Sequence, residues 1–329
     1  MHYEVASGHT RPLASVVVPA KAGPSPTSLP LALSPDQRFL YAATRSPPFL
    51  VSTFQIDPMT GTLALLHSTS LDCEMCFLTT DRTGQYLFGA SYVDGKLSVN
   101  RIGSTGCVEI PAMQTIQTRP KAHAVLLNRT NDILNATVLG GDEILQFAFD
   151  AATGNLTPLR PPTIATPAGW GPRHLVEHPT EPFVFVLNEI HGSVSTFLRD
   201  ARSGLLGEYA NMALPVENAY NSFSGADIHL TPDGKYLYAT ERCSNTLCSF
   251  EVLSNGQLIP LEATLVEPSP RSFAIDPAGR FLVLAGQLSN SIAIYLIDSQ
   301  TGDLTQAHRL SMHGNPSWVE IIRLAYQPS

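Results

Sequence analysis

One stretch of the sequence decides the fold: Gly169-Trp170-Gly171-Pro172-Arg173-His174-Leu175-Val176-Glu177-His178-Pro179, followed by Phe183-Val184-Phe185-Val186-Leu187-Asn188-Glu189. It has the pattern of a turn, a short apolar strand, a tight turn and a second apolar strand. Arg173 begins the first strand, and Glu189 follows the second. The two strands of a hairpin run antiparallel, so the start of one lies beside the end of the other. We therefore expect Arg173 and Glu189 at the same end of this hairpin.

The same pattern returns along the chain at intervals of about 50 residues, which is typical of repeat architectures. Each unit has a short turn rich in Pro, Asp, Asn, Thr and Gly between two apolar strands. These turns occupy residues 34–38, 80–84, 128–131, 178–181, 231–234 and 276–279. A second marker, Asp-x-x-Thr/Ser-Gly, begins at residues 57, 150, 200 and 298. It predicts the hairpin between the third and fourth strands of a unit.

These markers predict an all-β chain that forms a single domain over residues 1–329. The fold we expect is a seven-bladed β-propeller of four-stranded antiparallel blades; two packed β-sandwiches are the alternative. Six complete units begin near Leu29, Glu74, Ala122, Arg173, Ala226 and Arg271.

The seventh blade is expected to join the two ends of the chain and so close the ring. Residues 316–322 would supply its first strand, and residues 2–6 and 13–18 its third and fourth strands. This blade lacks a second strand, so either the true start lies upstream or the blade is one strand short. A missing interior strand would leave backbone groups unpaired.

Composition narrows the function classes. The net charge is -8, which argues against a nucleic-acid partner because such proteins carry a basic face. No apolar run approaches the roughly 20 residues that cross a bilayer, so no membrane partner is expected. The N-terminal residues lack the pattern of a signal peptide, which predicts a cytoplasmic location. A homo-oligomer is left open.

The five cysteines do not form a framework of regular spacings. Cys73 and Cys76 have the spacing of a metal knuckle, but no second Cys/His pair accompanies them. They belong to an expected strand, where residues three apart point to opposite faces. We therefore predict buried free thiols.

The candidate site follows from the geometry of a propeller, in which the first strands line the channel and the second strands run back outside them. The starts of the first strands and the ends of the second strands therefore gather around one mouth. The first group holds His123, Arg173 with His174, Asp227 and Arg271; the second holds Arg45, Tyr92, Glu189, Arg242 and Gln287.

This concentration of charge exceeds what turns require, which indicates a functional site. The alternative is a solvated collar of salt bridges. Two other histidines are expected to be structural, His229 within the core and His178 within a turn.

The types of residue at the mouth favour an anionic substrate clamped by arginines, with His and Glu moving protons. The sequence has neither a Gly-x-Ser-x-Gly motif nor a glycine-rich phosphate loop. We predict no cofactor and no metal. Metal binding through His123, Glu189, Asp227 and His229 stays open as an alternative, although no two of them have close ligand spacing.

Five motifs in order resemble the lactonase seven-bladed β-propeller family over most of the chain, from Leu13 to Val319. They are Gly171-Pro172-Arg173-His174, Asn188-Glu189, Ala226-Asp227-Ile228-His229-Leu230-Thr231-Pro232-Asp233-Gly234, Pro270-Arg271-Ser272-Phe273 and Ala285-Gly286-Gln287. The family includes bacterial propeller-type 6-phosphogluconolactonases and the fungal carboxy-cis,cis-muconate cyclase. The resemblance is greatest to the bacterial branch.

The resemblance implies hydrolysis of 6-phospho-D-glucono-1,5-lactone, with His123, Arg173 and Glu189 as the catalytic residues. His123 or Glu189 would activate water, and Arg173 would stabilise the oxyanion. The substrate would be bound by Arg271, Arg242, Asp227, Gln287, Arg45 and Tyr92, with the phosphate on Arg242 and Arg271. The alternatives are a carboxymuconate cycloisomerase, another sugar lactonase, or a non-enzymatic scaffold that binds protein partners.

Overall fold

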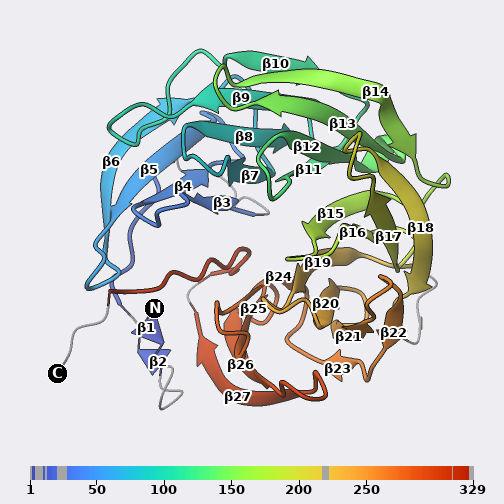
Figure 1. Ribbon diagram of the computed structural model, residues 1–329. Coiled ribbons are helices and arrows are strands. Elements are labelled where there is room, and N and C mark those ends of the chain that lie inside the picture. The colour runs from blue at the N-terminus through green and yellow to red at the C-terminus, as the bar shows by residue number, and fades with distance from the viewer. Residues whose placement is uncertain are drawn as a thin grey trace.

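A computed structural model describes residues 2–3, 10–11, 13–20, 28–216, 222–312 and 314–325. Successive antiparallel sheets are arranged in a ring (Figure 1). In each sheet the first strand lies innermost, and from the first sheet to the sixth it packs against the first strand of the sheet that follows in the chain. The predicted all-β propeller architecture is therefore confirmed.

Six of the predicted units form sheets of four strands, and one of these sheets has an additional short strand. The first three sheets contain β3 (Leu31–Leu33), β4 (Phe39–Ala43), β5 (Leu50–Ile56) and β6 (Leu63–Ser70); β7 (Phe77–Thr80), β8 (Tyr86–Ser91), β9 (Lys96–Arg101) and β10 (Gln114–Gln117); β11 (Ala122–Leu127), β12 (Ile133–Val138), β13 (Glu143–Asp150) and β14 (Asn155–Ala165).

The next three sheets complete the described part of the ring. They contain β15 (Pro172–Glu177), β16 (Phe183–Asn188), β17 (Ser193–Arg199) and β18 (Leu206–Ala213); β19 (Gly225–Leu230), β20 (Tyr236–Glu241), β21 (Thr246–Val252), β22 (Leu258–Pro260) and β23 (Thr264–Leu265); β24 (Pro270–Ile275), β25 (Phe281–Gly286), β26 (Ser291–Ile297) and β27 (Leu304–Ser311). A short 3-10 turn, η1 (Leu139–Gly141), follows β12.

The repeated Thr-Gly marker has a packing role between neighbouring sheets. Gly154 has a φ of +79°, and a Cβ atom added there would lie 2.3 Å from the ring of Tyr86. Gly302 has the same relation to Tyr236, at 2.4 Å. Only glycine combines this left-handed backbone with so close an approach of a neighbouring aromatic ring. The marker therefore fixes how the outer hairpin of one sheet rests on the sheet before it.

The predicted count of seven four-stranded blades is wrong for the described residues, which form six. Residues 13–18 and 316–322 were expected to be strands, but no strand is assigned to either segment. β1 (His2–Tyr3) pairs only with β2 (Thr10–Arg11), and residues 4–6 of the expected strand 2–6 lie outside the described residues. Neighbouring strands lie about 4.8 Å apart, so a first strand cannot pair with a third one when no second strand stands between them.

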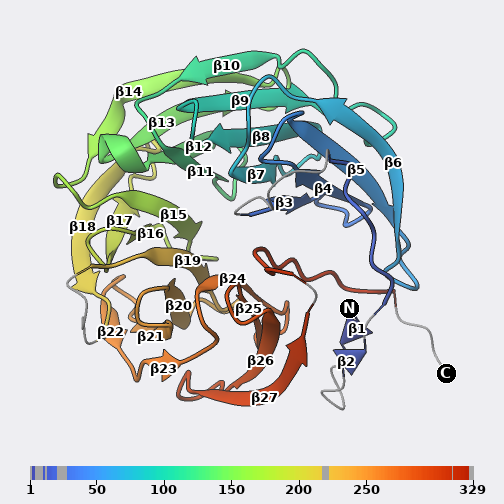
Figure 2. The ribbon, with the colours of Figure 1, turned by 180° about the vertical axis from the view of Figure 1, so that it is seen from behind.

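The C-terminal segment nevertheless bridges the two ends of the ring. The amide of Val319 donates to Oγ of Ser272 in the last sheet, and the amide of Arg323 donates to Oε1 of Gln37 beside the first sheet. Val319 and Ile321 also pack against the apolar cluster of β25 and β26. Figures 1 and 2 both show this segment running between β24 and β3, with β1 and β2 nearby. Closure therefore comes from side-chain packing and a few hydrogen bonds.

The expectation for the cysteines is partly right. All five are free, and Cys73 and Cys76 are buried. Both lie in the bend before β7, however, and so they precede the strand in which we expected them. Burial raises the pKa of Cys76 to about 12. Its thiol contacts the backbone oxygens of Ala122 and His123, at 3.5 and 3.4 Å, and so supports the start of β11.

Candidate active site

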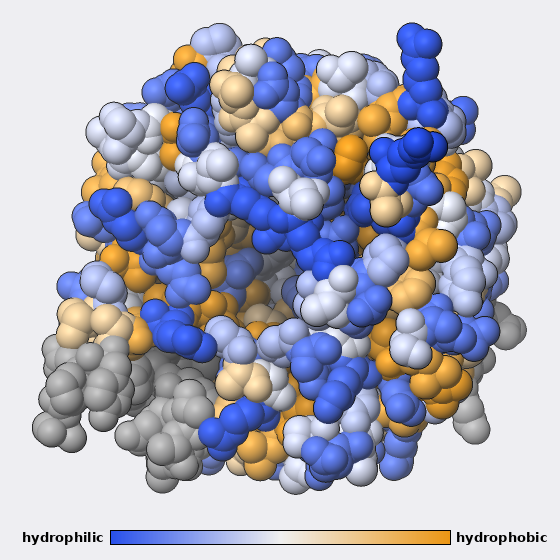
Figure 3. Space-filling model, in the orientation of Figure 1, coloured by the Kyte–Doolittle hydropathy of each residue, from blue (hydrophilic) through white to orange (hydrophobic). Residues whose placement is uncertain are grey.

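The sheets bring the predicted charged residues together at the inner strand ends. His123, Arg173, Asp227 and Arg271 lie at the second or third residue of β11, β15, β19 and β24. Each of these strands shifts register against its partner at that point, as in a β-bulge. Bulges re-aim side chains and are common next to active sites. Figure 3 shows a hollow near the centre of the ring, bordered by hydrophilic residues.

Glu189 lies between two arginines from neighbouring sheets. Its Oε2 is 2.8 Å from Nε of Arg173, and its Oε1 is 2.9 Å from Nη2 of Arg242. The predicted proximity of Arg173 and Glu189 is confirmed. Arg242 is also held by the backbone oxygens of Ser224 and Gly225. Both oxygens of Glu189 therefore face a guanidinium group.

Arg173 keeps unused hydrogen-bonding capacity despite this ion pair. It is buried, and neither Nε nor Nη1 has a hydrogen-bond partner in the described structure. Nε is engaged by the ion pair with Glu189 at 2.8 Å, so Nη1 is the unused donor. A buried guanidinium with free donors is suited to receive an acceptor from a ligand.

The arginines outnumber the carboxylates around them. Arg45 binds Glu74 through Nε at 2.5 Å and through Nη2 at 3.3 Å, while Arg271 makes no hydrogen bond or ion pair with the described residues. Burial and repulsion from Arg173 and Arg242 lower the pKa of Arg271. A guanidinium nevertheless stays protonated at neutral pH. Four guanidinium groups thus face three carboxylates, because the charge of Asp227 also acts on Arg173, and one positive charge is left in excess.

A second cluster of polar residues lies beside the arginines. Nδ1 of His174 is 2.8 Å from Oδ1 of Asp227, and Nε2 of His229 is 3.4 Å from the same oxygen. Although burial favours its neutral acid, His229 and His174 hold the pKa of Asp227 well below its usual value. Burial and the charge of Arg173 lower the pKa of His174 to about 4, so its imidazole is neutral at pH 7.

His123 lies against this cluster. Its ring centroid is 5.2 Å from that of His174 and 5.7 Å from that of Tyr92, with edge-on contacts in both cases. Burial, followed by the charge of Arg173, lowers the pKa of His123 well below its usual value. His123 is therefore a neutral imidazole at physiological pH, which is the state that a general base requires.

Each of the other predicted site residues bonds to groups of the protein. Tyr92 follows β8, and its amide donates to Oε1 of Glu74. Gln287 follows β25 and is half-buried, with its amide bonded to the backbone oxygen of Ser269. Asp227 is buried and both of its carboxylate oxygens bond to protein groups, so the carboxylate points into the protein interior.

Of the two histidines that we expected to be structural, the structure confirms one and not the other. His178 confirms the expectation: its Nδ1 accepts from the amides of Thr180 and Glu181, and its Nε2 lies 3.2 Å from the backbone oxygen of Gly234. His229 is not a core residue, because 40% of its side chain is exposed beside Asp227. Alternation along β19, disturbed by the bulge near its start, turns this side chain away from the core.

Sequence reasoning missed several members of the site. Glu74 stands just before β7 and binds Arg45, although its position at the start of a unit was a usable signal. Trp318, from the C-terminal segment, makes an edge contact with Phe77 at 5.6 Å and lies 6.3 Å from the ring of His174. Its place in the expected first strand of the closing blade could have predicted this approach to the channel.

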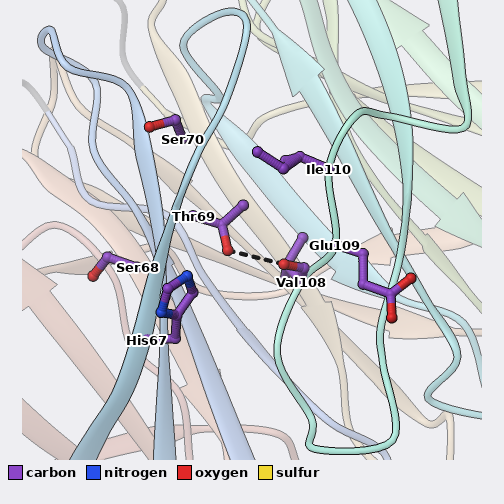
Figure 4. Close-up of a pocket in the computed structure, with 7 residues that line it drawn as sticks. All are labelled: His67, Ser68, Thr69, Ser70, Val108, Glu109 and Ile110. Atoms are coloured by element: carbon purple, nitrogen blue, oxygen red, sulfur yellow. Dashed lines mark hydrogen bonds between the residues drawn. The ribbon is translucent and has the colours of Figure 1, made fainter.

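No metal site is formed in the part of the chain that the structure describes, where no group of three His, Cys, Asp or Glu side chains could hold an ion. A cavity of about 490 Å³ lies away from the arginines, between the outermost strand β6 and residues 108–110. Figure 4 shows its lining, in which Oγ1 of Thr69 donates to the backbone oxygen of Val108 at 2.8 Å. It contains none of the predicted site residues.

Comparison with known proteins places the chain in a family. A family model described as "Lactonase, 7-bladed beta-propeller" matches residues 4–321. The chain belongs to this family. A curated relative from Pectobacterium carotovorum subsp. carotovorum, named 6-phosphogluconolactonase, is 34% identical over 97% of this chain and 93% of its own length. A Yersinia pestis relative of the same name is 35% identical over 89% of this chain and 86% of its own.

Solved structures agree with this assignment. A putative 6-phosphogluconolactonase from Bacteroides fragilis has a TM-score of 0.85 and 31% identity, covering 96% of this chain and 91% of the other. A periplasmic gluconolactonase from Pseudomonas aeruginosa has a TM-score of 0.84 and 25% identity, covering 96% and 92%. The family model describes seven blades, whereas the described residues of this chain form six four-stranded sheets.

Proposed function

We propose that this protein hydrolyses 6-phospho-D-glucono-1,5-lactone to 6-phosphogluconate, a step of the oxidative pentose phosphate pathway, at the inner strand ends of the propeller. The observation that carries the proposal is the unbalanced arginine cluster, in which Arg271 has no acceptor among the described residues and Nη1 of Arg173 has no hydrogen-bond partner there. The family and the names of the relatives support the same reaction.

The phosphate of this substrate suits the excess positive charge. A phosphate monoester carries a charge of about -1.5 to -2 at pH 7 and offers three acceptor oxygens. Arg271 binds it in our proposal, because its guanidinium is half-buried, unpaired and repelled by its neighbours. A bound anion relieves that repulsion. Arg242 is engaged with Glu189, Ser224 and Gly225, so it contributes through the charge that it presents.

His123 serves as the general base. It takes a proton from water while the water oxygen bonds to C1 of the lactone, and the carbonyl oxygen becomes an oxyanion. The free N–H groups of Arg173 receive that oxyanion, a contribution typically worth about 3–4 kcal/mol for one well-placed donor. The bond from C1 to the ring oxygen then breaks, and His123 returns its proton to that oxygen. The carboxylic acid so formed releases its own proton to solvent.

Glu189 positions the arginines rather than taking the proton. Each of its oxygens already contacts a guanidinium, at 2.8 Å from Arg173 and 2.9 Å from Arg242. His123 is therefore the better base, because its imidazole is neutral and is not held between two charged groups. The carboxylate of Asp227 points into the protein interior and does not contact substrate in this mechanism.

The chain contains, within the residues that the structure describes, no helix with the length and hydrophobicity needed to cross a bilayer. A cytoplasmic location belongs to the proposal, because charged sugar phosphates cross membranes poorly and are used where they are made.

A panel of freshly prepared lactones tests the proposal. We expect turnover of the phosphorylated lactone well above its spontaneous hydrolysis, and weaker turnover of glucono-1,5-lactone. Turnover of glucono-1,5-lactone alone would show that the substrate is a neutral sugar lactone and not the phosphorylated one. Turnover of carboxymuconate without lactone hydrolysis would make the protein a cycloisomerase. Activity on none of them, with loss of a protein partner when Arg271 is replaced, would favour a scaffold.

A further inference from the structure

The clearest feature that the proposed reaction does not use is the pair formed by Asp227 and His174. The carboxylate of Asp227 is fixed on both sides: Oδ1 accepts from the amide of Ile228 at 3.0 Å, and Oδ2 accepts from the amide of Phe273 at 3.1 Å. The amide of Asp227 in turn donates to Oγ1 of Thr240. This carboxylate therefore presents Oδ1 to His174 in one defined position.

The contact with Asp227 determines where His174 carries its proton. An ionised carboxylate only accepts hydrogen bonds, so Nδ1 of His174, 2.8 Å away, must be the donor. In the neutral ring, Nε2 then carries a lone pair. This Nε2 is buried and has no hydrogen-bond partner in the described structure. Edge contacts with Phe77 at 5.3 Å help to hold the ring in place.

His123 has the complementary deficiency. Its Nδ1 is also buried and has no partner, whereas its Nε2 is not enclosed in this way. The two rings lie next to each other, with centroids 5.2 Å apart and planes inclined by 65°. The two nitrogens form no hydrogen bond with each other, so the preference is electrostatic: a proton on Nδ1 of His123 would place a buried N–H dipole next to the ring that carries the buried lone pair. The opposite tautomer would set two buried lone pairs near each other, which is unfavourable.

We propose that Asp227 and His174 are positioning residues that fix the tautomer of His123. Asp227 sets the proton of His174 on Nδ1, and the lone pair of His174 Nε2 selects the form of His123 that is protonated on Nδ1. Nε2 of His123 is then left as the lone pair that takes the proton from water. The role of Nε2 of His123 as the base rests on the proposed function, whereas the tautomer of His123 does not.

The tautomer can be measured without any substrate. Full-length protein labelled with ¹⁵N-histidine is studied by long-range ¹H–¹⁵N NMR at pH 7.5, with the signals of His123 assigned through His123→Gln. We expect the wild-type Nδ1 of His123 to have the shift of a protonated nitrogen. Asp227→Asn and His174→Phe should move both nitrogens of His123 toward the averaged shifts of a mixed tautomer. His174→Gln, which offers an acceptor in place of Nε2, should move them less.

His229→Gln is the matched control, because His229 touches the same Asp227 oxygen from the channel side. It should leave the shifts of His123 unchanged. A wild-type His123 protonated on Nε2 would overturn the proposal, and so would shifts that do not respond to either Asp227→Asn or His174→Phe. If those two variants fail to fold, the wild-type spectrum and His174→Gln still decide the question.

An activity measurement separates this inference from the proposed function. If the wild type hydrolyses the phosphorylated lactone, Asp227→Asn should lower kcat about 10- to 100-fold with little change in KM, since it disturbs the base and not the phosphate. Rate loss without a change in the His123 shifts would contradict the tautomer lock. The predicted wild-type tautomer in a protein inactive on every lactone would support the lock and overturn only the proposed function.

Discussion

Nε of Arg173 lies 2.8 Å from Oε2 of Glu189, and these residues stand at the start of one strand and just after the end of its hairpin partner. The same Glu189 contacts Arg242 of the next sheet at 2.9 Å. One carboxylate therefore contacts guanidinium groups from two neighbouring sheets. The free N–H groups of Arg173 are the part of this arrangement that our mechanism uses.

Replacing Arg173 by Lys should lower kcat for the lactone about 100- to 1000-fold, the range typical of a lost oxyanion donor. Lysine keeps the charge but loses the planar set of donors. Stopped-flow or coupled assays would measure the loss. Arg199→Lys is the control, because Arg199 forms a similar buried pair with Glu177 at 3.0 Å, where β15 and β17 of the same sheet end, far from the start of β15 that holds Arg173. Equal losses in both variants would contradict a specific role for Arg173.

Inorganic phosphate should stabilise the wild-type protein if the excess charge binds anions. A ligand that binds only the folded state raises the free energy of unfolding, by about 2.7 kcal/mol at 100 times its Kd. Thermal unfolding at constant ionic strength, with phosphate replaced by chloride, would show the shift in Tm. Arg271→Met should reduce that shift, whereas Arg38→Met, at an exposed arginine, should not. An equal phosphate response in both variants would contradict a local anion site.

The C-terminal segment should contribute to stability through packing, since it forms no strand ladder. Ile321 packs against the cluster of Phe281, Val283 and Ile294. Ile321→Asp should therefore lower the free energy of unfolding by about 1–3 kcal/mol, the scale for an apolar side chain removed from water. Leu265→Asp is the control, because Leu265 is 78% exposed. Urea titrations that give the same midpoint for Ile321→Asp and wild type would contradict the closure described above.

Acid should destabilise the protein through His174. Its pKa in the folded state is about 4, below the 6.5 of an ordinary histidine, so the unfolded chain binds this proton first as the pH falls. Stability is lost between pH 6.5 and pH 4. His229, whose pKa is raised beside Asp227, has an effect of the opposite sign, but this effect varies with pH only above 6.5 and is constant between pH 6.5 and pH 4. The decisive quantity is therefore the difference between variants: His174→Gln should show a smaller fall in the urea midpoint from pH 7 to pH 4.5 than wild type. Identical falls would contradict the assignment.

Much of the fold could be predicted because a hairpin relates strand ends to one another. Arg173 and Glu189, only one hairpin apart, met as expected, and the six complete units all formed sheets. The seventh blade failed because the segments from the two chain ends have no second strand between them. Each of these segments was predicted from its own sequence pattern, but a strand forms only where a neighbouring strand can pair with it.

The pairing of His174 with Asp227 could not be predicted in the same way. These residues are on neighbouring sheets, and the bulges at the starts of β15 and β19 decide which of the local side chains turn toward each other. Alternation along an ideal strand does not include such a shift. His229 was misjudged for the same reason, and Trp318 because its segment is placed by tertiary packing alone.

The most direct test of the central claim compares two lactones in wild type and Arg271→Met. The substrates are freshly generated 6-phospho-D-glucono-1,5-lactone and glucono-1,5-lactone, each corrected for spontaneous hydrolysis. Loss of a charge-assisted contact to phosphate should raise KM for the phosphorylated lactone about 10- to 100-fold and leave KM for the unphosphorylated one unchanged. Wild-type protein that does not accelerate either reaction, or a variant with equal changes on both lactones, would contradict the account.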